Sequence, residues 1–279
     1  MRAEQVTEAV TYHGEGPVWS ARWGGLRWVD MLAGDVLSLR PDATVTRRRI
    51  GRIAAAVRPR SRGGAVFGVE RGFALEDPDG TVAHLPELWA DEQVRMNDGG
   101  CDPHGRFYCG SMAGRTGGGA LYRLDPDGAV HVVLPRVTIS NGLDWSPDGT
   151  RAYHNDTPTQ QITVFDYDRE AGLTDPRPLV RIPADAGGPD GLTVDSEGGV
   201  WVALHSGGAV HRYTPDGVLD EVIELPTPMV TACTFGGPGL DELFITTSRE
   251  GLDADDPAAG ALFRAEVGIA GQPVREYAG

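Results

Sequence analysis

Six copies of one short pattern run along this chain and constrain its fold more than any other feature. In each copy an apolar strand leads into a glycine-containing turn, and a β-rich strand with an aromatic residue follows. One anchor residue marks the apolar strand of each copy: Trp19, Val57, Cys101, Trp145, Val194 and Phe235. Successive anchors lie 38, 44, 44, 49 and 41 residues apart. Self-similarity at such a period is typical of a repeat architecture.

Further hairpins fill the intervals between these copies. The stretches GALYRLDPDGAVHVVL from Gly119 and GAVHRYTPDGVLDEVIEL from Gly208 each place two β-rich runs around a Pro-Asp-Gly turn. Each repeat therefore contains about four strands, and no stretch has convincing helical periodicity. The sequence predicts an all-β chain that folds as one six-bladed β-propeller domain over residues 1–279, with four antiparallel strands in each blade. The main alternative, an irregular β-sandwich, does not account for the even spacing.

The charge of the chain narrows its partners. Its 279 residues include 40 acidic and 25 basic side chains, and the formal net charge of −15 disfavours nucleic acid and anionic membrane surfaces. Lysine is absent, so Schiff-base chemistry and a P-loop lysine are excluded. The first 13 residues lack the apolar core of a secretion signal, and no apolar run approaches the roughly 20 residues that cross a bilayer. We expect a cytoplasmic protein, monomeric or weakly homo-oligomeric.

Several familiar catalytic motifs are missing from the sequence. It contains no GxSxG elbow and no HExxH pair, which removes support for serine-hydrolase and zinc-protease mechanisms. The three cysteines, Cys101, Cys109 and Cys233, are odd in number and lack zinc-type spacing, so we expect buried free thiols. His154 and His205 each follow the second strand of a repeat, where a position facing the pocket and an ordinary core position are both open.

The repeat also predicts which side chains meet at the centre. The first strand of each propeller blade lines the central channel, so equivalent positions on the six strands converge near the axis. The residues four positions before the anchors are Glu15, Ile53, Asn97, Asn141, Asp190 and Thr231. Five of these six side chains carry oxygen, although any one of them alone would be an ordinary turn former. Two carboxylates in a confined channel repel each other and lack solvation unless a cation lies between them.

This set of side chains indicates the kind of metal. Carboxylate and amide oxygens without cysteine suit one hard divalent cation such as Ca²⁺, Mg²⁺ or Mn²⁺, with Zn²⁺ or Fe²⁺ as alternatives. Three protein ligands leave coordination positions free for water or substrate, as in a catalytic site. A non-catalytic calcium-binding propeller is the alternative from another class. Scaffold propellers usually repeat the same residue in every blade, whereas these channel residues differ from blade to blade.

The same residues carry a resemblance to a known family. The stretches concerned include EGPVW (15–19), RMNDGGCDPHGRFYCGSM (95–112), ISNGLDWSPDG (139–149) and PDGLTVDSEGGVWVALHSGG (189–208). In these motifs the chain resembles the SMP-30/gluconolactonase/regucalcin family, six-bladed propellers that hydrolyse sugar lactones. The resemblance implies that Glu15, Asn141 and Asp190 bind the metal, with Ca²⁺ the first choice, and that Arg95 and Asn97 contact a small-molecule sugar lactone. From its position alone, Asn97 could serve either the metal or the substrate. It also implies that Asp190 activates the attacking water.

One departure from the family pattern concerns the lid. Some relatives carry a longer acidic loop with a substrate-contacting glutamate after the strand equivalent to 109–112, whereas this chain has the short stretch AGRTGGG at 113–119. The family's substrate preference therefore does not transfer intact. A metal-dependent hydrolase of aryl esters or organophosphates on the same scaffold is a second alternative. It calls for an apolar pocket, and the polar Arg95 and Asn97 count against it.

Overall fold

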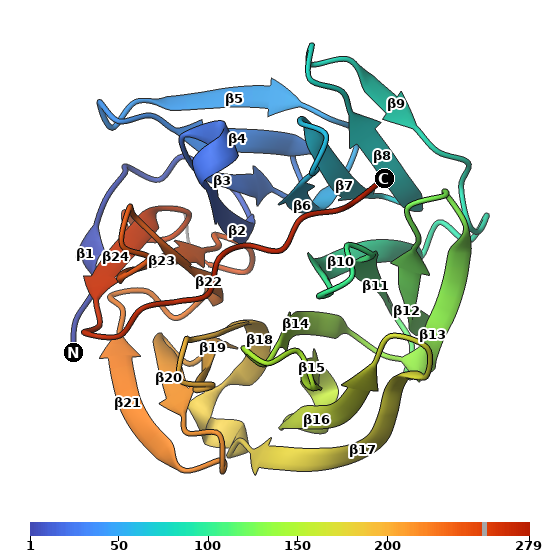
Figure 1. The fold of residues 1–279 in the computed structure, drawn as a ribbon. Helices are drawn as coiled ribbons and strands as arrows, with labels where there is room; N and C mark the ends of the chain where they lie inside the picture. Colours follow the sequence, from blue (N-terminus) through green and yellow to red (C-terminus); the bar gives the residue numbers. More distant parts are fainter. Residues whose placement is uncertain (253–255) are drawn as a thin grey trace.

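The computed structural model describes residues 1–252 and 256–279, and these form six four-stranded antiparallel sheets arranged as a ring (Figure 1). The predicted six-bladed β-propeller is confirmed. We number the blades in chain order from the one that begins with β2. All six anchors lie on the innermost strands, so the period in the sequence corresponds to one blade.

Each blade contributes one strand to each of four concentric layers. The innermost strands are β2 (Gly14–Ser20), β6 (Ala54–Pro59), β10 (Val94–Cys101), β14 (Ser140–Trp145), β18 (Gly188–Val194) and β22 (Val230–Gly236). The second strands are β3 (Gly25–Asp30), β7 (Ala65–Val69), β11 (Phe107–Ala113), β15 (Arg151–Asp156), β19 (Val200–His205) and β23 (Glu242–Thr247). The third strands are β4 (Asp35–Leu39), β8 (Gly72–Glu76), β12 (Gly119–Leu124), β16 (Gln161–Asp168), β20 (Ala209–Tyr213) and β24 (Leu262–Glu266). The outer strands are β5 (Val45–Arg49), β9 (Val82–His84), β13 (Val130–Val137), β17 (Gly172–Arg181), β21 (Leu219–Glu224) and β1 (Glu4–Gln5).

Short 3₁₀ turns complete the secondary structure of the described residues: η1 (Ala21–Trp23), η2 (Thr157–Thr159) and η3 (Ala184–Ala186). No helix in the described part of the chain has the length and apolar character needed to cross a bilayer.

The ring is closed by the N-terminal segment. Strand β1 pairs antiparallel with β24, so Gln5 lies opposite Phe263 and the sixth blade combines the two ends of the chain. Pairing β1 with the outer edge of this blade satisfies backbone groups that would otherwise form an open sheet edge.

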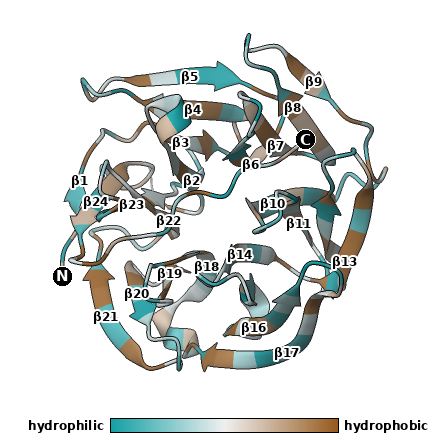
Figure 2. Cartoon of the chain, viewed as in Figure 1, coloured by the Kyte–Doolittle hydropathy of each residue, from teal (hydrophilic) through white to brown (hydrophobic). Residues whose placement is uncertain are grey.

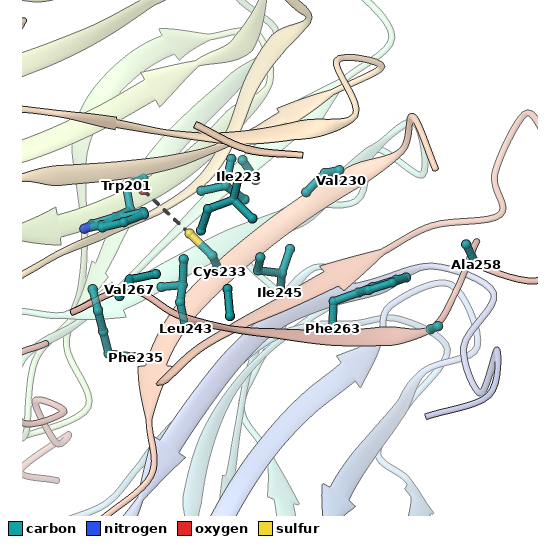
Figure 3. Close-up of a cluster of buried hydrophobic side chains, with 14 residues drawn as sticks. Trp201, Ile223, Val230, Cys233, Phe235, Leu243, Ile245, Ala258, Phe263 and Val267 are labelled. Atoms are coloured by element: carbon teal, nitrogen blue, oxygen red, sulfur yellow. Dashed lines mark hydrogen bonds between the residues drawn. The ribbon is translucent and has the colours of Figure 1, made fainter. Parts of the chain in front are cut away.

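Apolar side chains fill the space between neighbouring blades. Between blades five and six, Trp201 packs edge to face on Phe235 with ring centroids 5.9 Å apart, and Ile245 and Phe263 extend the same cluster (Figure 3). Cys233 lies in this cluster, with its sulfur 3.7 Å from the carbonyl oxygen of Trp201. Hydrophilic and hydrophobic segments alternate along outer strands such as β13 and β17, which are mostly exposed or half-buried (Figure 2). All three cysteines are free and buried, as predicted.

All six inner strands share a backbone irregularity. Each is interrupted by a shift in its pairing with the second strand, between Glu15 and Val18 in β2, Met96 and Gly99 in β10, and Pro189 and Leu192 in β18, with corresponding shifts in β6, β14 and β22. Such β-bulges leave residues outside the hydrogen-bonded ladder and change the direction of their side chains. The bulges coincide with the predicted channel positions or adjoin them.

A C-terminal segment, residues 267–279, crosses one end of the ring (Figure 1). It is held by backbone hydrogen bonds such as Gly271 N to the Leu240 oxygen at 2.7 Å and Tyr277 N to the Pro59 oxygen at 2.8 Å. The Arg275 guanidinium lies 3.2 Å from Asp144 on β14. Together with the C-terminal halves of the inner strands, this segment encloses a small polar space at that end of the channel.

Candidate active site

The opposite end of the channel, where the inner strands begin, holds a pocket of about 200 Å³. The structure brings all five sequence-predicted side chains together there. The pocket is lined by His13, Glu15, Arg95, Asn97, Met112, Ile139, Asn141, Thr157, Asp190, His205 and Glu250. Ile53 and Thr231, which also shared the predicted register, do not line it. Thr231 instead donates a hydrogen bond from Oγ1 to the Gly14 oxygen at 2.6 Å.

The bulges, and the glycines beside them, allow this convergence. Gly142 and Gly191 lie where neighbouring inner strands approach each other closely. A Cβ on Gly142 would lie 2.6 Å from the Asp190 oxygen, and one on Gly191 would lie 2.4 Å from the Ala232 Cβ. Contacts this short leave no room for a side chain, so glycine at both positions lets adjacent strands crowd around the axis.

A directional chain of hydrogen bonds fixes the polar wall of the pocket. Arg95 Nη1 donates to Asn97 Oδ1 at 2.8 Å, and Asn97 Nδ2 donates to Asn141 Oδ1 at 2.9 Å. Asn141 Nδ2 in turn donates to Thr157 Oγ1 at 2.8 Å, and the Thr157 hydroxyl donates to the Pro189 oxygen at 2.8 Å. Each amide is therefore held in one orientation, with its oxygen on the side of the preceding donor.

The Arg95 guanidinium remains available to a ligand. Burial lowers the pKa of Arg95, while the carboxylates of Glu250, Glu15 and Asp190 act in the opposite direction. No carboxylate among the described residues lies within ion-pair distance of it. Its positive charge therefore faces the pocket without a direct ionic partner.

Two carboxylates of the pocket, Glu15 and Asp190, are buried, and the charge of Glu15 affects the pKa of Asp190. Glu15 is 3% exposed and Asp190 is 5% exposed. Burial raises the pKa of Glu15 to about 8, the carboxylate of Asp98 acts in the same direction, and the Gly16 backbone N–H and Arg95 oppose the rise. Burial, Glu15 and Asp98 raise the pKa of Asp190 well above its ordinary value. Both carboxyl groups thus disfavour ionisation unless positive charge is added.

These groups fit a hard divalent cation. Asp190 Oδ1 is buried and has no hydrogen-bond partner among the described residues, and an unpaired buried acceptor is costly unless it has another kind of partner. Glu15, Asn141 and Asp190 offer two carboxylates and one oriented amide oxygen, the donor types that hard divalent cations prefer. Within the described residues no three His, Cys, Asp or Glu side chains gather in a metal-binding group. The third oxygen donor of this set is the amide of Asn141.

Two histidine expectations are resolved by the structure. His205 lines the pocket, whereas His154 does not. His154 is buried behind β14, with Nε2 2.8 Å from the Ser140 hydroxyl. Burial lowers the pKa of His154 to about 4 and also lowers the pKa of His205, so both rings are neutral near neutral pH.

Other lining residues were missed by the sequence reasoning. His13 precedes β2 and places Nδ1 2.8 Å from the Ser248 hydroxyl and 3.4 Å from Glu250 Oε2. Burial, Arg95 and His205 lower the pKa of His13 to about 3. Met112 and Ile139 form an apolar wall. The position of His13 two residues before Glu15 was an available signal, whereas Glu250 follows a second strand, which the count along inner strands did not sample.

Comparison with known proteins identifies the family. The model of the SMP-30/gluconolactonase/LRE-like region matches residues 13–249. The chain belongs to this family. A 6-deoxy-6-sulfogluconolactonase of Pseudomonas putida is 38% identical over 95% of each chain, and the pentonolactonase XacC of Haloferax volcanii is 35% identical over 98% of this chain and 97% of that protein. The calcium-binding protein regucalcin of Agrobacterium tumefaciens superposes with a TM-score of 0.91 at 28% identity, covering 99% of this chain and 96% of that one.

The lid of this SMP-30 family member is tied away from the pocket. Between β11 and β12 the loop 114–118 contributes no side chain to the pocket lining. Arg115 pairs with Asp91 at 3.0 Å, and the Gly117 N–H donates to Thr138 Oγ1 at 3.0 Å. The glutamate expected in some relatives therefore has no counterpart in this loop, and the nearest lining residue on that side is Met112.

Proposed function

We propose that this chain is a metal-dependent lactonase that hydrolyses a sugar lactone to the open-chain sugar acid. The supporting observation is the convergence, in one pocket, of the Glu15, Asn141 and Asp190 oxygens with the polar pair Arg95 and Asn97. Relatives named for pentonolactone and sulfogluconolactone hydrolysis agree with this activity. The pocket also combines the apolar Met112 and Ile139 with a few convergent polar groups, as small-ligand sites do.

Glu15, Asn141 and Asp190 would hold one divalent cation, with Ca²⁺ the first choice because a relative of the same fold is named as calcium-binding. A cation bound there would polarise the lactone carbonyl and stabilise the charge that develops on its oxygen. The hydrogen-bond chain from Arg95 through Asn97 keeps the Asn141 oxygen oriented toward this site.

Other steps of the proposed reaction, proton transfer and substrate binding, are assigned to the side chains of the pocket. Asp190, ionised when positive charge lies beside it, takes a proton from the attacking water through its unpaired Oδ1. Arg95 and Asn97 bind ring hydroxyls: the guanidinium donates to them, whereas Asn97 accepts through Oδ1, because its Nδ2 already donates to the Ser140 oxygen and to Asn141 Oδ1. Met112 and Ile139 lie against the less polar face of the sugar ring.

The decisive experiment removes bound metal with a chelator, restores Ca²⁺, Mg²⁺, Mn²⁺, Zn²⁺ or Fe²⁺ one at a time, and follows acid release from pentono- and hexonolactones. We expect activity to disappear on chelation and to return with at least one ion. Asp190→Asn should abolish turnover without unfolding the chain, whereas Asp127→Asn, at an exposed turn, should keep full activity.

A fully metallated protein that opens no lactone faster than buffer would refute the lactonase proposal. Calcium binding without turnover would instead support a calcium-binding role. Faster hydrolysis of an aryl ester or an organophosphate than of any sugar lactone would favour a different hydrolase on this scaffold. Wild-type activity in Asp190→Asn would remove Asp190 from the mechanism.

A further inference from the structure

Glu250 is a carboxylate of the pocket that the proposed reaction does not use. It follows β23 in blade six, and Arg95 lies on β10 in blade three, so the two residues face each other across the ring. The Glu250 backbone N–H donates to the Ser248 hydroxyl at 2.9 Å, which anchors the start of this loop. Its side chain is 50% exposed, which places the carboxylate at the pocket mouth.

The carboxylate of Glu250 has no fixed ionic partner of its own. Among the described residues, the basic side chain within ion-pair distance of it is His13, whose Nδ1 lies at 3.4 Å on a ring that also contacts Ser248. No arginine among the described residues lies within ion-pair distance of Glu250. Its negative charge therefore acts on the pocket and on any ligand that enters it.

Each charged side chain that lines the pocket can be matched with an opposite charge. Glu15 and Asp190 together match the charge of one divalent cation. Arg95 carries the one permanent positive charge among the described lining residues, and Glu250 is the remaining carboxylate. Glu250 raises the pKa of Arg95 more than Glu15 or Asp190 does. With Glu250 in place, the pocket offers no surplus positive charge to an anion.

We propose that Glu250 is a specificity-determining residue: its carboxylate balances Arg95 at the mouth of the pocket and thereby selects uncharged sugar lactones over lactones that carry an anionic group. This inference rests on the proposed lactonase function and names its substrate class. The physical reason is that an anionic substituent would be repelled by the Glu250 carboxylate. The attraction of that substituent to Arg95 would be reduced, because Glu250 partly cancels the positive charge of Arg95. Hydroxyl groups, in contrast, donate hydrogen bonds to a carboxylate, so the same residue favours a neutral polyol ring.

The test compares a hexonolactone with the same lactone bearing a phosphate at C6, using full-length protein saturated with the activating ion. The measured quantity is kcat/KM for the anionic lactone divided by kcat/KM for the neutral one. Glu250→Gln should raise this ratio roughly tenfold, mainly through a lower KM for the anionic lactone, and Glu250→Lys should raise it further. Added salt should raise the ratio of the wild type more than that of Glu250→Gln, because salt screens the repulsion.

Glu170→Gln is the matched control, because Glu170 is exposed on the turn after β16, at the end of that strand remote from the pocket. It should leave the ratio unchanged. If neutral lactones are hydrolysed but both Glu250 variants keep the wild-type ratio, the charge-selection proposal fails while the lactonase proposal stands. A wild type that prefers the phosphorylated lactone would also overturn the selection. If no lactone is opened, both proposals fail.

Discussion

Removal of the cation should make the stability of this protein fall as pH rises, in a range set by the buried carboxylates. Glu15 has its pKa raised from 4.5 to about 8 in the metal-free fold, whereas in the unfolded chain it ionises near its ordinary value. Between these two values the folded state binds more protons than the unfolded state. The free energy of unfolding therefore decreases as pH rises through this window.

At lower pH the buried histidines have the opposite effect, because they make the free energy of unfolding increase with pH. The Glu15 effect is therefore best measured above pH 6.5. His13 and His154 have pKa values lowered to about 3 and about 4, so between about pH 4 and pH 6.5 the unfolded chain protonates them and the folded chain does not. Their contribution to stability increases with pH and is complete above the ordinary histidine pKa. From pH 6.5 to 8 the Glu15 effect remains, and Asp190 acts in the same direction.

The expected magnitude follows from this window. About 1.5 pH units at roughly 1.4 kcal/mol per unit give a loss of about 2 kcal/mol in the free energy of unfolding. For a chain of 279 residues such a change lowers Tm by roughly 3–4 °C. The assay is thermal unfolding of chelator-treated protein at pH 6.5 and pH 8, beside the same protein saturated with Ca²⁺ and beside Glu15→Gln.

Saturating Ca²⁺ should remove the loss, because a cation between ionised carboxylates stabilises their charged forms. The metal-free Glu15→Gln variant should lose less stability than the metal-free wild type over the same range, and Glu170→Gln should match the wild type. If metal-free wild type and Glu15→Gln show the same change in Tm between the two pH values, the assignment of a protonated, buried Glu15 is wrong.

Three substitutions test the hydrogen bonds of the site, the packing of the inner strands and the stability of the propeller. Asn97→Ala should lower kcat/KM for a neutral lactone roughly 10- to 100-fold, because it leaves buried groups without their hydrogen-bond partners. Gly191→Ala should weaken cation affinity, measured by calorimetry, and destabilise the fold by about 1–3 kcal/mol, because the new Cβ would lie 2.4 Å from that of Ala232. Asp195→Ala should cost on the order of 3–5 kcal/mol in denaturant unfolding, because the buried Asp195 carboxylate accepts from Arg212 Nε at 2.8 Å and from Trp201 Nε1 at 2.9 Å; unchanged stability would contradict this account.

The repeat predicted the frame of the molecule because one blade corresponds to one period of the sequence. Anchors such as Trp145 and Phe235 pack between blades, and their spacing directly reports blade length. Side chains at a common distance from these anchors reach a common height in the channel. That geometric equivalence is why Glu15, Asn97, Asn141 and Asp190 were predicted to converge and do so.

The remaining features escaped prediction for definite physical reasons. Thr231 satisfied the counting rule, but its hydroxyl reaches a nearer acceptor, the Gly14 oxygen, and so does not face the pocket. Glu250 reaches the pocket from a loop, whose path depends on three-dimensional contacts such as the one to Ser248 rather than on strand periodicity. The bulges insert unpaired residues into each inner strand, and periodicity alone does not reveal such insertions.

The C-terminal segment that crosses the ring has a kinetic consequence for the proposed reaction. Residues 272–275 lie over the end of the channel remote from the pocket, so a lactone and its hydrolysis product would both pass the pocket mouth beside Glu250. Entry of the substrate and exit of the product would therefore compete for this route. Ring opening also converts an uncharged ligand into a carboxylate anion, and this anion leaves past Glu250. The same negative charge at the mouth that disfavours anionic substrates would shorten the residence of the product.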